Sequence, residues 1–278
     1  MTSRRTPART AGALALAACA VTLTCAPVEA AASPAGTDSW GTVLQTDSPV
    51  QADAWSVRIS GRSGLLVSGD TRAHFPAFDG APSGHDDRDK EARLSYKAQP
   101  IGVLDEPYTS TEATGAKKDG VRAETTFHSI DLASPYRPGP QGAAPHGDVG
   151  IALDKVRVVA DSTPGHTVRF TTSVASGTVY AGGKAVHRLD GKKWRPNTGL
   201  RFPSAENVPP VLVATVNEQI TTDDQGHPTT DATGSSYRFD PSATSGYANA
   251  LHMTVLSPEV ADFTIGHAAV LRRPDAAG

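Results

Sequence analysis

Cysteine is almost absent from this chain. Its 278 residues include only two, Cys19 and Cys25, and both lie within the first 32 residues. The rest of the chain therefore cannot use a disulfide framework, a catalytic thiol or a cysteine-ligated zinc ion. Its fold has to be stabilised by an ordinary hydrophobic core, which a chain of this length can supply.

Aromatic residues and methionine are also scarce, at 6% and two residues, whereas the chain contains 26 glycines and 21 prolines. This composition favours short strands joined by many turns. The sequence has no long apolar run after residue 32, so no transmembrane segment is expected there. It has no excess of positive charge either, since the formal net charge is −3. Neither nucleic acid nor an anionic membrane is therefore an expected partner.

Residues 1–32 have the pattern of a secretory signal peptide. Three arginines (Arg4, Arg5 and Arg9) precede an apolar run over 11–27, and small residues follow up to Ala32. A basic head, a short apolar middle and an Ala-x-Ala exit are typical of a segment that is removed on export. We therefore expect a secreted, extracellular protein of about 246 residues, which begins with a flexible stretch over 33–50.

Cys19 offers an alternative form of export. The sequence Leu16-Ala17-Ala18-Cys19 fits the lipobox of bacterial lipoproteins, in which the cysteine is acylated and anchors the protein to the cell membrane. However, the apolar run continues past this position to Cys25, where a lipoprotein would usually become polar. Simple secretion is therefore favoured over lipidation.

Alternation of apolar and polar residues dominates the rest of the chain. Trp55, Val57 and Ile59 are expected to share one strand face, and the same period of two recurs over 121–128, 167–174 and 261–265. Residues 211–216 are apolar at nearly every position, which indicates a strand placed centrally in a sheet. Over 151–158 the apolar phase shifts, which suggests a β-bulge.

A Pro/Gly-rich loop at 134–147 separates an N-terminal β portion (51–133) from a C-terminal β portion (148–272), and a short tail over 273–278 ends the chain. No window after the signal shows a long helical stripe, so the signal should be the only helix. The pattern predicts an all-β fold of sandwich-like antiparallel sheets, arranged as one domain or as two β subdomains.

Candidates for chemistry are few. The acidic segment His85–Asp89 suits a solvated loop better than a metal site, because Arg88 lies within it, Lys90 follows it and Gly/Pro residues precede it. Asp223–His227 lacks the spacing of a calcium loop and is expected to be a polar hairpin tip. The chain has no nucleophile elbow, no His-Glu-x-x-His zinc motif and no nucleotide-binding loop. The sequence predicts no catalytic residues, metal or cofactor, although carboxylate pairs for glycoside hydrolysis stay open because their spacing depends on the fold.

Three short motifs carry a resemblance to a known family: VLVATVNEQI over 211–220, YANALH over 247–252 and ADFTIGHA over 261–268. They resemble the choice-of-anchor P domain of actinobacterial secreted proteins, and the likeness covers most of 50–270. This resemblance implies an exported, mostly β, non-catalytic module at or near the cell envelope. The family carries no attributed catalytic residues, so the resemblance assigns none here.

The same motifs contain the candidate structural residues Asn217, Glu218, Gln219, Asn249 and His252. The first three follow an apolar strand and precede a turn, so their side chains are expected to satisfy free backbone groups at the strand end. The expected function is that of an exported non-catalytic β module, structural or ligand-binding, with an unknown cell-envelope or extracellular ligand as its partner. A secreted hydrolase acting on polysaccharide or ester is the alternative.

The processing of the signal can be tested directly. We expect the mature protein to begin near Ala31–Ser33 without a lipid, because the apolar run passes through Cys19 to the alanine-rich exit. Cys19→Ala should leave release into the medium unchanged, as judged by cell fractionation and intact mass. A mass that matches a diacylated Cys19 terminus would contradict simple secretion.

Overall fold

The computed structural model describes residues 48–61, 64–65, 72–77, 82–96, 99–134, 149–181, 184–189, 195–205, 207–229, 239–255 and 261–273. The predicted signal peptide with Cys19, residues 33–47, most of the 134–147 loop and the tail after 273 lie outside these ranges. Residues 36–278 form one compact unit, and residues 1–35 are counted as another. All described residues belong to the unit of residues 36–278.

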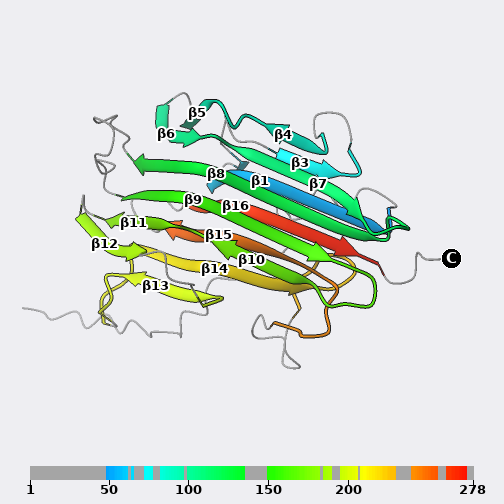
Figure 1. The fold of residues 1–278 in the computed structure, drawn as a ribbon. Helices are drawn as coiled ribbons and strands as arrows, with labels where there is room; N and C mark the ends of the chain where they lie inside the picture. The colour runs from blue at the N-terminus through cyan, green and yellow to red at the C-terminus, as the bar shows by residue number, and fades with distance from the viewer. Residues whose placement is uncertain are drawn as a thin grey trace, which may run out of the picture. The chain divides into compact units, whose positions relative to one another are not determined.

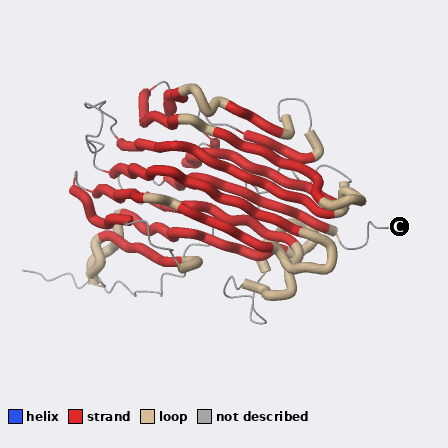
Figure 2. Tube along the Cα trace, viewed as in Figure 1, coloured by secondary structure: helices blue, strands red, loops and turns tan. Residues whose placement is uncertain are grey.

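The described residues form two antiparallel β-sheets (Figure 1). The seven-stranded sheet has the order β13 (Thr198–Phe202), β14 (Leu212–Thr222), β15 (Ser245–Val255), β16 (Ala261–Arg272), β1 (Val50–Gly61) and β2 (Gly64–Leu65), and β3 (Arg72–Phe75) also pairs with β1. The described residues contain no helix (Figure 2), so the predicted all-β class is confirmed. No described helix is therefore long and apolar enough to cross a membrane.

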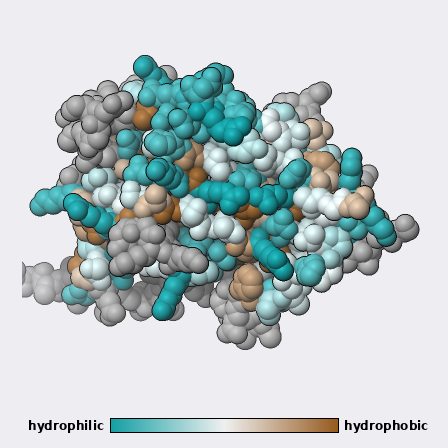
Figure 3. Space-filling model, in the orientation of Figure 1, coloured by the Kyte–Doolittle hydropathy of each residue, from teal (hydrophilic) through white to brown (hydrophobic). Residues whose placement is uncertain are grey.

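The nine-stranded sheet is built around two long strands. Its order is β12 (Lys184–Leu189), β11 (Ser176–Ala181), β9 (Val149–Ser162), β8 (Gly120–Ser134), β6 (Gln99–Asp105) and β5 (Glu91–Tyr96). Three further strands attach to it: β10 (Arg169–Ser173) to β9, β7 (Tyr108–Thr114) to β8, and β4 (Gly84–Asp86) to β7. This sheet turns a mainly hydrophilic face to the viewer in Figure 3. Charged pairs such as Arg157 with Glu124 lie on this exposed face.

The two sheets pack on one hydrophobic core, which confirms the predicted sandwich-like arrangement. Both sheets contribute fully buried residues to it, among them Ile130, Leu153, Leu251 and Ile265. A polar contact also joins the sheets, because the Thr125 hydroxyl of β8 donates a hydrogen bond to the backbone oxygen of His267 on β16, at 2.6 Å. Burying these aliphatic side chains supplies the main driving force for the fold.

The predicted N-terminal and C-terminal portions contribute strands to both sheets. β8 and β9 lie on either side of the 134–147 loop and pair antiparallel from Val121↔Ser162 to Ser134↔Val149. In the other sheet, the N-terminal strand β1 pairs with the C-terminal strand β16. The two portions therefore form a single compact unit rather than two subdomains.

Regular alternation holds over 121–127 of β8 and in β10, but the inward positions of β8 shift between Phe127 and Ile130, and alternation also fails in β1. Along β1, Ala52, Ala54 and Val57 belong to the core between the sheets, so the inward phase shifts between residues 54 and 57. Trp55 stacks instead on His267, and the Arg58 guanidinium lies 4.0 Å from the centre of its ring. Residues three apart in a regular strand face opposite ways. The expectation that Trp55 shares a face with Val57 is therefore wrong.

The change of inward-facing side that occurs in β1, called the reversal from here on, also occurs in the three strands that follow it across the sheet, β16, β15 and β14. Ser56, Gly266, Ala250 and Asn217 lie in one row across β1, β16, β15 and β14, and the regular pairing skips this row while keeping the same register on both sides. Two of the four have a positive φ, 62° at Gly266 and 50° at Asn217. Beside this row β15 turns two consecutive residues, Ala250 and Leu251, into the core.

The nine-stranded sheet has a matching reversal where a bulge was expected. The inward positions of β9 shift from Ile151 and Leu153 to Val156 and Val158. However, no residue is inserted, since Phe127↔Val156 and Ser129↔Asp154 keep one register. A positive φ of 51° at Lys155 turns the strand instead. The predicted change of phase is confirmed, but its cause is backbone conformation rather than a bulge.

Gly266 should be the most sensitive position of this reversal. Its φ of 62° disfavours any L side chain, and a Cβ there would lie 3.2 Å from Ala250, Val156 and Val158. Gly266→Ala should lower the free energy of unfolding by roughly 2–4 kcal/mol, measured by urea denaturation.

Gly165 provides the matched control, because it also has a positive φ, of 76°, but a Cβ there would meet nothing within 4 Å. Gly165→Ala should therefore cost only about 1–2 kcal/mol. Equal losses in the two variants would show that crowding at the reversal contributes nothing.

Candidate functional site

A row of polar and aromatic side chains crosses the outer face of the seven-stranded sheet, the face turned away from the other sheet. Its members lie directly opposite one another on β14, β15, β16, β1 and β3: Glu218, Asn249, His267, Trp55 and Arg72. Each is the direct neighbour of a reversal-row residue on its strand or, as Arg72 does, pairs with such a neighbour, so the reversal determines that these side chains face away from the core. Asn249, His267 and Trp55 are nevertheless buried.

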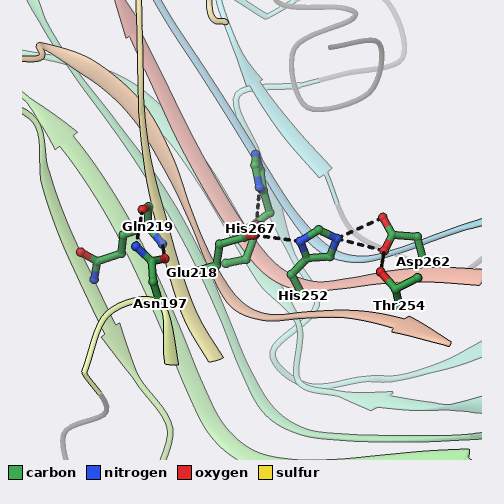
Figure 4. A network of polar contacts seen from close by, with 8 residues as sticks. Asn197, Glu218, Gln219, His252, Thr254, Asp262 and His267 are labelled. Carbon is green, nitrogen blue, oxygen red and sulfur yellow. Dashed lines mark hydrogen bonds and ion pairs between the residues drawn. The ribbon is translucent and has the colours of Figure 1, made fainter. Parts of the chain in front are cut away.

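His252 lies between two carboxylates at one end of this network (Figure 4). Its Nδ1 is 2.9 Å from Glu218 Oε1, and its Nε2 is 2.9 Å from Asp262 Oδ1. The hydroxyl of Thr254 donates a further hydrogen bond to Asp262 Oδ1, at 3.0 Å. Glu218, His252 and Asp262 come from β14, β15 and β16, so this Glu–His–Asp group links three adjacent strands.

The charge of His252 follows from this placement. Burial alone would lower the pKa of the imidazole, but hydrogen bonds and charge attraction from Asp262 and Glu218 outweigh it and raise the pKa to about 10. His252 is therefore an imidazolium at neutral pH, and both of its ring nitrogens donate to carboxylates.

A second branch of the network leads from Glu218 to His267. The amide nitrogen of Asn249 donates to Glu218 Oε2 at 2.6 Å, and Asn249 Oδ1 lies 2.6 Å from His267 Nδ1. Burial, together with the charges of Arg58 and Arg72, holds the pKa of His267 well below its usual value. His267 is therefore neutral, and its Nδ1 carries the proton because the Asn249 oxygen can only accept.

Aromatic and cationic groups surround His267. The Trp55 ring stacks on it with centroids 3.4 Å apart and planes 15° apart, and the Tyr247 ring lies 5.6 Å away. On β3 beside this group, Arg72 forms an ion pair with the buried Asp53, at 2.8 Å. Burial raises the pKa of Asp53 even though Arg72 opposes the rise.

The predicted trio Asn217, Glu218 and Gln219 does not lie at a strand end. β14 continues to Thr222, so the trio sits in its middle, and only Glu218 joins the network. The backbone of Gln219 is bonded by the side chain of Asn197, whose Oδ1 accepts from Gln219 N at 2.8 Å and whose Nδ2 donates to Gln219 O at 3.0 Å. The side chain of Gln219 donates to Asn217 Oδ1, at 2.9 Å (Figure 4 shows Asn197 and Gln219).

The structure therefore brings together Glu218, Asn249 and His252 of the five predicted structural residues. Sequence reasoning missed Asp262 and His267, which complete the two branches of the network. Both lie in the motif over 261–268. In a regular strand, however, Asp262 and His267 would point to opposite faces, so the sequence pattern did not suggest that they act together. Only the positive φ of Gly266 brings Asp262 and His267 to the same side.

The two acidic loops make mainly local contacts. Asp86 pairs with Arg88, and Asp87 pairs with Lys90 and His85. Asp223 Oδ1 accepts hydrogen bonds from the backbone of Gln225 and His227, which closes the predicted turn. Within the described ranges, no group of three or more acidic, histidine or cysteine side chains is arranged to hold a metal ion.

Comparison with known proteins does not place the chain in a family, since no family model, curated protein or solved structure matches it. The chemistry of the network has to be inferred from its geometry alone. His252 is protonated and fully engaged by Glu218 and Asp262, and its ring fills the space between the two carboxylates (Figure 4). An arrangement of this kind stabilises strands and is poorly suited to transfer a proton at neutral pH.

The charge on His252 makes stability depend on pH. Because folding raises its pKa from 6.5 to about 10, its contribution is fully present below pH 6.5 and is lost as the pH rises through about 10. At pH 6, His252→Gln should lower the free energy of unfolding by roughly 3 kcal/mol, since it removes the cation from two carboxylates.

That difference between wild type and His252→Gln should shrink steadily between pH 6.5 and 10 in chemical denaturation curves. His227→Gln is the control, because His227 is exposed and, within the described residues, its ring pairs with Asp223 alone, at 3.4 Å. It should change stability by less than about 0.5 kcal/mol at either pH. A His252→Gln loss that is the same at pH 6 and pH 10 would show that the imidazole is not charged in the folded protein.

Proposed function

We propose that this chain is an exported, non-catalytic β module that acts at the cell surface or in the medium, either as a structural element or as a binder of a cell-envelope or extracellular ligand. The proposal includes removal of the signal over 1–32 and a relation to the choice-of-anchor P family. It rests on the sequence for export and on the geometry of the polar network for the absence of catalysis.

One observation carries the non-catalytic part: the Glu218–His252–Asp262 trio. A general base needs a free lone pair near neutral pH, whereas a pKa of about 10 keeps His252 protonated. The hydrogen-bond partners of His252 are carboxylates, and that of His267 Nδ1 is an amide, so among the described residues neither ring is hydrogen-bonded to the hydroxyl of a serine or threonine. These side chains join β14, β15 and β16, which favours a structural role.

The alternative of a secreted hydrolase has one observation in its favour. Asp131 on β8 and Asp154 on β9 occupy diagonal positions of adjacent strands, and burial together with the charge of Asp154 raises the pKa of Asp131. Ser176 donates to Asp154 at 2.5 Å. Two carboxyl groups with different environments are the minimum requirement for glycoside hydrolysis.

Both candidates can be tested with the secreted protein and two variants. Wild type, His252→Gln and Asp131→Asn would be assayed on a panel of polysaccharides and esters, and their folding checked by thermal denaturation. We expect no turnover by any of them. Wild type should instead sediment with isolated cell envelopes or remain as a stable, inert protein in the medium.

Turnover by wild type that Asp131→Asn removes while its melting curve stays in place would overturn the module and establish the hydrolase. Loss of turnover in His252→Gln alone would be ambiguous without the melting curve, because this substitution should also weaken the fold. The Asp131 variant is therefore the decisive one.

A further inference from the structure

Two buried polar atoms beside the network have no hydrogen-bond partner among the residues that the structure describes: Nε2 of His267 and Nε1 of Trp55. The residues are exposed by only 1% and 2%, so bulk water does not reach them freely. Buried nitrogen and oxygen atoms are nearly always hydrogen-bonded in native proteins, and each exception requires an explanation. A buried donor or acceptor without a partner is unfavourable, because it has lost its hydrogen bond to water and gained none in return.

The two atoms are chemically complementary. His267 donates its Nδ1 proton to Asn249 Oδ1, which leaves Nε2 with an unshared electron pair that can only accept. Trp55 Nε1 carries a hydrogen and can only donate. Asn249 is itself held in one orientation, because its amide nitrogen donates to the Glu218 carboxylate. The Glu218–Asn249 arm of the network thus determines which His267 nitrogen is left to accept.

The two atoms are also close enough to share one partner. The stacked rings have centroids 3.4 Å apart and planes 15° apart, so nitrogens at the same edge of the two rings are separated by little more than the stacking distance. Two hydrogen bonds of about 2.9 Å through one oxygen span up to about 5.5 Å. The stacking distance therefore allows a single oxygen at one edge of the stack to reach both nitrogens.

We propose that the edge of the Trp55–His267 stack is a binding site for one hydroxyl oxygen, which accepts a hydrogen bond from Trp55 Nε1 and donates one to His267 Nε2. Water and the hydroxyl group of a bound small molecule share this chemistry. A metal cation does not fit, because it would meet the indole N–H and the neighbouring charges of Arg58 and Arg72. A carboxylate or phosphate does not fit either, since it cannot donate to Nε2.

Nuclear magnetic resonance of the ¹⁵N-labelled mature protein tests this site at pH 7. Long-range ¹H–¹⁵N spectra should show His267 as the Nδ1–H tautomer, with His252 in the same spectrum protonated on both nitrogens as an internal reference. Trp55→Phe identifies the Trp55 indole signal among the three tryptophans. That indole proton should show a cross-peak to a slowly exchanging hydroxyl proton.

The source of the oxygen is read from the same cross-peak. A peak at the water frequency assigns the site to a buried water molecule. A peak at another hydroxyl frequency, with a hydroxylated compound released on denaturation and detected by mass spectrometry, assigns it to a bound small molecule.

His267→Phe keeps an aromatic ring in the stack but removes the acceptor, and it should abolish the hydroxyl cross-peak of Trp55. The proposal is overturned if His267 carries its proton on Nε2, if the Trp55 indole proton shows no hydroxyl cross-peak, or if the peak is unchanged in His267→Phe. The first two outcomes need only the wild-type protein and the assignment variant, so they stand even if His267→Phe fails to fold.

Discussion

A row of four residues across β14, β15, β16 and β1 determines which side chains enter the core and which face away from it. Gly266 and Asn217 supply the positive φ values at this row, and register is kept on both sides. Side chains alternate along a strand. A local turn of the backbone therefore makes the odd-numbered and even-numbered positions beyond it change places between the core face and the outer face of the sheet. Gly266 also lies against Val156, next to Lys155, where β9 makes its own reversal. The two sheets therefore change phase where they touch, which keeps apolar residues facing each other along the whole length of the strands.

The reversal also creates the polar network, and the network explains how so many polar groups can be buried on the other face of the same sheet. Burying a charge or an unpaired amide is unfavourable unless a partner replaces water. Glu218 receives two partners, the amide of Asn249 and the ring of His252, and His252 in turn meets Asp262. His267 avoids the cost of charge by staying neutral. Two histidines in neighbouring strands thus have opposite protonation states: two carboxylates keep His252 charged, whereas burial and the charges of Arg58 and Arg72 keep His267 neutral.

The all-β class and the individual strands could be predicted from the sequence because period-two alternation is a local signal, as over 121–128. The trio at 217–219 was identified as structural, but its position in mid-strand was missed because Asn217 and Gln219 look like the start of a turn. His267 and Asp262 were missed for a different reason. Their meeting on one face depends on the backbone conformation at Gly266, and a glycine in a strand sequence does not state its φ. Cross-strand neighbours such as Glu218 and Asn249, which are 31 residues apart, depend on register, which one sequence does not reveal.

The protonation states also bear on function. Acid–base catalysis requires groups whose pKa lies near the working pH and whose reactive atom faces a substrate. In this protein the imidazole with the most carboxylate partners, His252, is held as a stable cation, and the neutral one, His267, is buried beneath a stacked indole. His252 lacks the free lone pair that a general base needs, and His267 is not accessible to a substrate. Both rings instead hold strands together: hydrogen bonds of His252 and His267 join β14, β15 and β16, and the stacking of Trp55 on His267 adds β1. Such cross-strand contacts would suit the extracellular module proposed above, because they restrain central strands that contain no cysteine.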